Sequence, residues 1–177
     1  MQITVPVASE TLSALQQLRK LKLQKLEVFT DKTQPNPEPG TLSHSVRLFS
    51  EMHIFVVTGQ LFFGLARHDI PTLSVTEVGS DNLKIASVTN DENVVLEFGS
   101  PALSEIAILW KTDIFAGHSV VWCDGDKIEY AVGIILKVGD TQLVISASVV
   151  EPSLTVITSQ SDIKKYLLDI DHVGFIL

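Results

Sequence analysis

Residues 119–158 decide the fold of this chain, and their centre at 130–149 reads Tyr-Ala-Val-Gly-Ile-Ile-Leu-Lys-Val-Gly-Asp-Thr-Gln-Leu-Val-Ile-Ser-Ala-Ser-Val. Gly139-Asp140 lies between two runs rich in β-branched residues. Glycine at the first central position of a two-residue loop supplies the positive φ that a tight hairpin turn requires. The stretch therefore predicts a β-hairpin that turns at Gly139-Asp140.

The turn fixes the register of this hairpin, because side chains alternate between the two faces of a strand. The larger apolar partners fall on one face: Val138 with Thr141, Leu136 with Leu143, Ile134 with Ile145, Val132 with Ala147, and Tyr130 with Val149. The opposite face is smaller and more polar: Lys137 with Gln142, Ile135 with Val144, Gly133 with Ser146, and Ala131 with Ser148.

Neighbouring turns extend the hairpin into an antiparallel meander. Asp124-Gly125 predicts a second two-residue turn, which sets Val121 against Ile128 and Trp122 against Lys127. Glu151-Pro152-Ser153 ends the next strand, because proline cannot donate to a ladder. Residues 154–158 return as a fourth strand, whose register depends on a loop of two or three residues.

The residues before this meander predict a helix and several strands. Residues 2–7 form a short edge strand, and Ser9 caps a helix over 9–20 with leucines at helical spacing. The following segment alternates and is extended to residue 29. Residues 30–40 contain three prolines and predict a surface loop.

Further strands are expected over 42–50, 52–65, 73–78, 83–89 and 93–98, the second of them broken into a hairpin at Thr58-Gly59. Pro101 at a first helical position predicts a helix over 101–110, with a strand as the alternative because Ile106, Ile108 and Trp110 alternate. A short helix closes the chain over 161–168. The fold class is α+β, mostly β, with antiparallel meander sheets, an N-terminal helix and one or two short helices in a single domain, 1–177.

The charge balance restricts the partners. The chain has 177 residues, and 13 Lys and Arg against 21 Asp and Glu give a formal net charge of −8. An acidic surface repels phosphate backbones, so we expect no nucleic acid as a partner. We expect a protein partner, and the charge favours a basic one. The longest nearly apolar run, 54–66, is too short to span a membrane. We expect a monomer or a dimer.

No catalytic, metal-binding or cofactor-binding motif stands out. The histidines, which are His44, His53, His68, His118 and His172, lack the local spacings of zinc sites. Cys123 is the only cysteine, and its neighbour Asp124 would raise the pKa of a thiol. A single cysteine and the absence of a basic and then apolar leader favour the cytoplasm.

The segment from Trp110 to Thr158 contains a Trp, a Gly-Ile-Ile-Leu strand, a Gly-Asp turn and a Leu-Val-Ile strand. It resembles the sheet end of some bacterial toxin immunity proteins. The resemblance implies a non-catalytic protein that neutralises a toxin by occlusion, and it identifies no binding residue. Candidate contacts to a basic partner are the acidic residues of predicted turns, namely Asp91, Glu92, Asp124, Asp126 and Glu151.

Two other functions stay open at this point. One is a small hydrolase-type enzyme whose residues meet only in the fold, which a pocket joining a histidine with a carboxylate would favour. The other is a structural subunit of a phage or secretion particle, held together by exposed strand edges.

Overall fold

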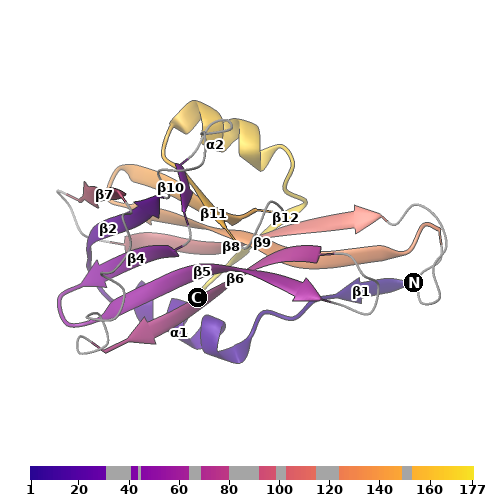
Figure 1. The fold of residues 1–177 in the computed structure, drawn as a ribbon, viewed down its shortest axis with the longest axis horizontal. Coiled ribbons are helices and arrows are strands. Elements are labelled where there is room, and N and C mark those ends of the chain that lie inside the picture. The colour runs from indigo at the N-terminus through magenta and orange to yellow at the C-terminus, as the bar shows by residue number, and fades with distance from the viewer. Residues whose placement is uncertain are drawn as a thin grey trace.

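Two β-sheets and two helices make up the part of the chain that the computed structural model describes (Figure 1). This part comprises residues 1–30, 41–43, 45–63, 69–79, 92–98, 103–114, 124–148 and 153–177. The Pro-rich segment at 31–40 and the expected strand at 83–89 lie outside it. The fold is mostly β with antiparallel sheets and an N-terminal helix, as the sequence predicts.

The larger sheet has seven strands. Its order is β12 (His172–Phe175), β8 (Leu103–Ile114), β9 (Lys127–Val138), β10 (Thr141–Ala147), β11 (Leu154–Ile157) and β3 (Thr41–Ser43). These strands are antiparallel neighbours. β1 (Gln2–Thr4) pairs in parallel with the beginning of β9. The chain from β8 to β11 is therefore a meander.

The smaller sheet has five antiparallel strands. Their order is β6 (Asp69–Val78), β5 (Ile54–Phe63), β4 (Ser45–Ser50), β2 (Leu23–Thr30) and β7 (Glu92–Glu97). Its outer face carries polar contacts at the surface: the Lys25 ammonium lies 2.7 Å from Glu27 Oε1 and 4.3 Å from the centre of the Phe49 ring.

A shared hydrophobic core joins the two sheets. Leu26, Leu48 and Phe55 of the smaller sheet and Leu136 and Leu143 of the larger one are fully buried in it. α1 (Ser9–Arg19) closes one side of this core with Leu15 and Leu18. These side chains recur on one stripe of α1, which explains why the helix forms where the leucine spacing predicts it.

A second cluster covers the outer face of the larger sheet. Ile135 of β9, Val144 of β10 and Ile157 of β11 pack there with Ile163 of α2 (Gln160–Leu167). Figure 1 shows α1 and α2 on opposite sides of the molecule. The larger sheet is therefore covered on both faces, and Ile135 and Val144, on the hairpin face predicted as smaller and more polar, are buried there.

The central hairpin is confirmed. Val138 pairs with Thr141, and the predicted register continues to Gly133 opposite Ser146. Gly139 has a φ of 56°, the left-handed conformation for which glycine is suited. β11 follows with Ala147 opposite Leu154, so the connection is longer than the two or three residues considered.

A β-bulge in β9 corrects the predicted faces. Leu109 of β8 pairs with Gly133 and Trp110 pairs with Ala131, so Val132 is an extra residue in the ladder. Beyond it, Ile134 and Leu136 lie in the shared core, whereas Val132 itself packs in the outer cluster. Ile128 and Tyr130 lie in the outer cluster as well. The single apolar row that strict alternation predicts is thus divided between two faces.

Pairing along β9 also corrects the turn at Asp124-Gly125. The turn exists, with φ 85° at Gly125, but Ile128 pairs with Asp113 of β8 on one side and Ile3 of β1 on the other. Both edges of β9 are therefore occupied, and the expected partnership of Ile128 with Val121 is wrong.

Three local predictions are also corrected. Residues 103–114 form β8, because alternating side chains fit a central strand and outweigh the helix signal of Pro101. β5 runs unbroken through Thr58-Gly59, where Gly59 pairs with Leu73 of β6. The N-cap of α1 is Ala8, and the Ser9 hydroxyl donates to Glu10 Oε2 instead.

Candidate functional site

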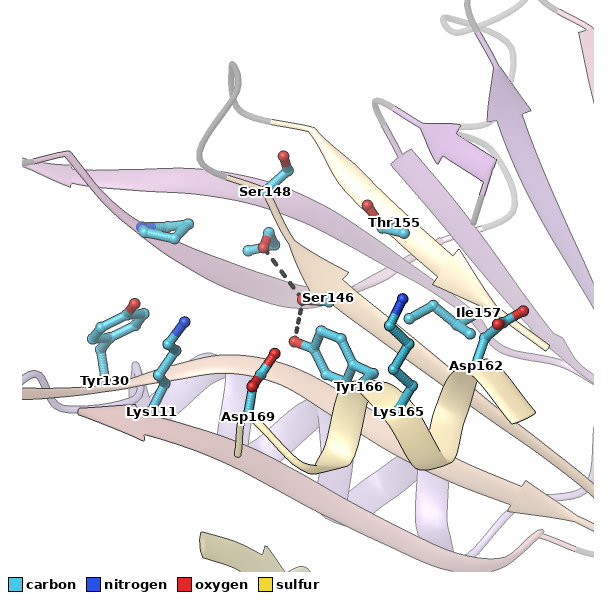
Figure 2. Close-up of a pocket in the computed structure, with 12 residues that line it drawn as sticks. Lys111, Tyr130, Ser146, Ser148, Thr155, Ile157, Asp162, Lys165, Tyr166 and Asp169 are labelled. Atoms are coloured by element: carbon cyan, nitrogen blue, oxygen red, sulfur yellow. Dashed lines mark hydrogen bonds between the residues drawn. The ribbon is translucent and has the colours of Figure 1, made fainter. Parts of the chain in front are cut away.

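A pocket of about 380 Å³ lies beneath α2, on the outer face of the larger sheet (Figure 2). Its lining combines hydroxyl, ammonium and carboxylate groups with apolar side chains: Pro71, Lys111, Tyr130, Ser146, Ala147, Ser148, Thr155, Ile157, Asp162, Lys165, Tyr166 and Asp169. A concave site with a few convergent polar groups is where proteins usually bind small groups.

Each lining element is placed by a feature of the sequence. The bulge at Val132 turns Tyr130 to the outer face, and Lys111 is its partner on β8. Side chains alternate along β10, so Ser146 points away from the shared core in which its neighbour Ile145 lies. The amphipathic spacing of α2 buries Ile163 and leaves its polar side chains beside the pocket.

The floor of the pocket is a hydroxyl network. Ser146 Oγ lies 2.5 Å from the Tyr166 hydroxyl and 3.3 Å from the carbonyl oxygens of Val132 and Ala147 (Figure 2). Ser146 is only 4% exposed, so its hydroxyl needs these partners. Because Gly133 has no side chain, β10 can lie close to β9 at this point: a Cβ on Gly133 would lie 2.8 Å from the backbone oxygen of Ile145.

Tyr130 forms one wall and is anchored by an acid. Its hydroxyl donates to Asp113 Oδ2 at 2.9 Å. Burial raises the pKa of Tyr130 far above its ordinary value, and the hydrogen bond to Asp113 and the nearby charges of Asp113 and Asp171 raise it further. Tyr130 is therefore neutral across the physiological range.

Tyr166 also keeps its proton. Burial raises its pKa above the ordinary value for tyrosine, Asp169 adds to this, and the hydrogen bond with Ser146 opposes it. Because a neutral phenol is a poor base, the contact between Ser146 and Tyr166 is a structural hydrogen bond and does not activate the serine. Both phenols serve as hydrogen-bonding groups.

The charged side chains of the pocket are not paired with one another. Lys111 and Lys165 supply ammonium groups, and Asp162 and Asp169 supply carboxylates. Within the described ranges, none of these four side chains forms a hydrogen bond or a salt bridge. Figure 2 shows Lys111 beside Tyr130, Asp169 between Lys111 and Tyr166, and Lys165 and Asp162 on the other side of Tyr166.

The acids expected to contact a partner are not brought together. Asp126 is 5% exposed and its carboxylate binds the amino group of Met1, which corrects the expectation of a surface acid. Asp124 is exposed in the turn before β9, whereas Glu92 begins β7 in the other sheet. Asp91 and Glu151 lie outside the described residues.

The histidines do not assemble a metal site in the part of the chain that the structure describes. His172 stacks on Trp110 with ring centroids 5.6 Å apart, and its Nδ1 lies 3.4 Å from Glu129 Oε1. His53 Nδ1 lies 2.5 Å from Glu77 Oε1. His44, His68, His118 and Cys123 are outside the described residues.

A second depression lies between α1 and β6, with Gln17 and Glu77 in its lining. His53 contacts both residues, its Nδ1 lying 3.4 Å from Gln17 Nε2. The other polar lining residues are Ser9, Glu10, Ser13 and Thr76, all of them exposed. A histidine therefore lies beside a carboxylate at this depression. Its polar groups are exposed to solvent, however, whereas the pocket beneath α2 has a buried, hydrogen-bonded floor.

Sequence reasoning missed the residues of the pocket. Ser146 was placed on the polar face of the hairpin, and its position opposite Gly133 was the available signal. Lys111 directly follows the segment 101–110 that is predicted as a helix, and no motif marks it. Tyr166 was recognised only as part of a short helix, since nothing in the sequence shows that α2 folds back over β10.

Known proteins supply no assignment for this site: no family model, no curated protein and no solved structure matches the chain. Among the described residues, neither helix has the length and apolar character needed to cross a bilayer.

Proposed function

We propose that this protein is a non-catalytic binding module and that the pocket beneath α2 is its recognition site. One observation carries the proposal: a concave site of about 380 Å³ has a buried, hydrogen-bonded floor, while the ammonium and carboxylate groups around it have no partner among the described residues. Charged side chains that converge on a pocket without pairing with one another are suited to contact a bound molecule.

Binding is favoured over chemistry by the state of the hydroxyl groups. Nucleophilic catalysis by a serine requires an adjacent general base. The group beside Ser146 is Tyr166, whose pKa lies above the ordinary value because it is buried. Ser146 is itself 4% exposed and bonded to backbone carbonyls, so its oxygen is poorly presented to a substrate.

The narrower proposal concerns the partner. We propose a protein partner, and specifically a bacterial toxin that this chain neutralises by occlusion in the cytoplasm. The support is the formal net charge of −8, which would speed the encounter with a basic partner. The exposed turn at Asp124 supplies negative charge at the surface, whereas buried Asp126 does not take part.

A variant that fills the pocket tests the recognition site. Thr155 pairs with Ser146 and lines the pocket, so Thr155→Trp would occupy it. Gln142→Trp is the matched control, because Gln142 lies on the same face of β10 as Ser146 but outside the pocket. Both variants are co-expressed with the product of the gene immediately upstream, which is tested as the toxin, and growth is measured.

The wild type and Gln142→Trp should restore growth, and Thr155→Trp should fail while keeping its circular dichroism spectrum. Equal protection by both variants would remove the pocket from the recognition site. Affinity of the purified pair that does not change with salt concentration would contradict the charge argument, since attraction between exposed charges is screened by salt.

A further inference from the structure

The pocket carries charge of both signs. Its lining holds the ammonium groups of Lys111 and Lys165 and the carboxylates of Asp162 and Asp169. An anion would meet both lysines but also both aspartates, and a cation would face the reverse conflict. Only a ligand with both charges lets each of its ends lie against an opposite one.

The two ends of the pocket differ in their balance of charge. On the Tyr130 side of Tyr166, Lys111 shares the pocket with Asp169. Two more acids lie close to Tyr130: Asp113 accepts its hydroxyl proton, and Asp171 is close enough to raise its pKa. At the other end Lys165 stands beside a single acid, Asp162 (Figure 2). A cationic group is therefore better placed near Tyr130, and an anionic group near Lys165.

The phenols support the same orientation. Tyr130 donates its proton to Asp113. Ser146 contacts two backbone carbonyls, and either its hydroxyl or that of Tyr166 can be the donor in the bond between them. Both phenols line the pocket and their oxygens carry lone pairs, to which a ligand ammonium can donate.

Size limits the ligand. The pocket of about 380 Å³ is at the lower end of the range of roughly 300–1,000 Å³ that small-molecule sites occupy. Together with the charges, this suits a compact zwitterion more than a nucleotide or a lipid.

From these observations we infer that the pocket beneath α2 binds a small zwitterion of the amino-acid class, a free amino acid or a dipeptide, with its ammonium toward Tyr130 and Asp169 and its carboxylate toward Lys165. The inference rests on the proposed binding pocket and goes beyond the protein partner, because it gives the pocket a small-molecule ligand of its own. No bond is made or broken, because the ligand is held and released.

Binding of defined probes to the full chain tests this inference. Each of the amino acids and their glycyl dipeptides is added at millimolar concentration, and amide shifts of Ser146 and Tyr166 are followed by NMR. At least one zwitterion should bind. Its N-acetyl derivative and its amide should each bind about ten-fold more weakly, because each lacks one charge, a loss of about 1.4 kcal/mol.

Three variants locate the charges. Lys165→Gln and Asp169→Asn should each weaken binding of the same probe about ten-fold by removing a charge-assisted contact. Lys164→Gln is the control, since Lys164 is exposed on the same helix and does not line the pocket. It should leave the affinity unchanged.

Two results would overturn the inference: no probe shifts the pocket residues, or the blocked derivatives bind as well as the parent zwitterion. The second comparison uses the wild type and does not depend on any variant folding. If the zwitterions fail while Thr155→Trp still abolishes protection, the ligand class is wrong and the recognition site stands. If Thr155→Trp protects fully, the proposed function fails by itself.

Discussion

The two halves of β9 behave differently although they belong to one strand. After the bulge, Ile134 and Leu136 point into the core between the sheets, as alternation predicts. Before it, Ile128 and Tyr130 point to the outer face and meet the residues packed under α2. The half after the bulge packs in the core between the sheets, whereas the half before it packs in the second cluster, which includes Ile70 of β6, and contributes the wall of a pocket. One additional backbone residue separates these roles.

Deletion of Val132 is the most severe test of this difference. Removing the bulge residue would shift the register by one and exchange every side chain before it to the opposite face. Tyr130 would then enter the apolar core, so we expect a loss of more than about 4 kcal/mol in the free energy of unfolding. Urea denaturation measures it. Val132→Ala keeps the bulge and should remain folded; equal effects of the two changes would contradict the assigned role.

Ile134→Ala tests the half of β9 that faces the shared core. Ile134 is fully buried, and truncation should cost about 2–5 kcal/mol through lost burial and a residual cavity. The midpoint of urea unfolding should fall. Probe binding in the pocket should be unchanged at temperatures where the variant is folded, and a matching loss of binding would show that the two halves are not separate.

Gly133→Ala tests the boundary between the halves. The new Cβ would lie 2.8 Å from the Ile145 carbonyl oxygen, so β10 must move away from β9. We expect a loss of about 1–3 kcal/mol and a change in the NMR environment of Ser146, whose hydroxyl reaches the Val132 carbonyl across this gap. Gly79→Ala is the control, since a Cβ there meets nothing within 4 Å. An unshifted Ser146 signal would contradict the close approach.

Tyr130→Phe should have the smallest effect on stability at neutral pH, about 0.5–1.5 kcal/mol for one hydrogen bond. Its pH dependence is more informative. The folded pKa of Tyr130 is raised above 10, so the folded state holds this proton more tightly than the unfolded chain does. That contribution is complete below pH 10 and is lost as the pH rises above it.

Wild-type protein should therefore lose more stability than Tyr130→Phe between neutral pH and strongly alkaline pH. Thermal unfolding of both proteins across this range measures the difference, and lysine titration cancels because both chains contain the same lysines. Parallel decline of the two curves would show that Tyr130 is not the protonated, acid-anchored wall described above.

Local signals accounted for much of the fold. The turn at Gly139-Asp140 fixed the register of the central hairpin, because a glycine with positive φ leaves few alternatives for the pairs beside it. Leucine spacing located α1, and a polar start followed by apolar spacing located α2. These features depend on neighbours within a few residues, which the sequence displays directly.

Competition between distant segments could not be predicted in this way. Residues 103–114 became a strand because β9 and β12 flank them, a choice that helix signals around Pro101 do not register. Asp126 looked like a surface acid and is buried against the amino group of Met1, which β1 brings alongside β9.

The sequence by itself determined the class of fold, the central hairpin and its turn, and an excess of negative charge. The tertiary structure alone decided where the bulge at Val132 falls and that α2 covers the outer face beside Tyr130 and Ser146. The physical reason is that alternation and turn geometry are local, whereas a bulge and a pocket arise from how strands and a helix far apart in the chain fit against one another.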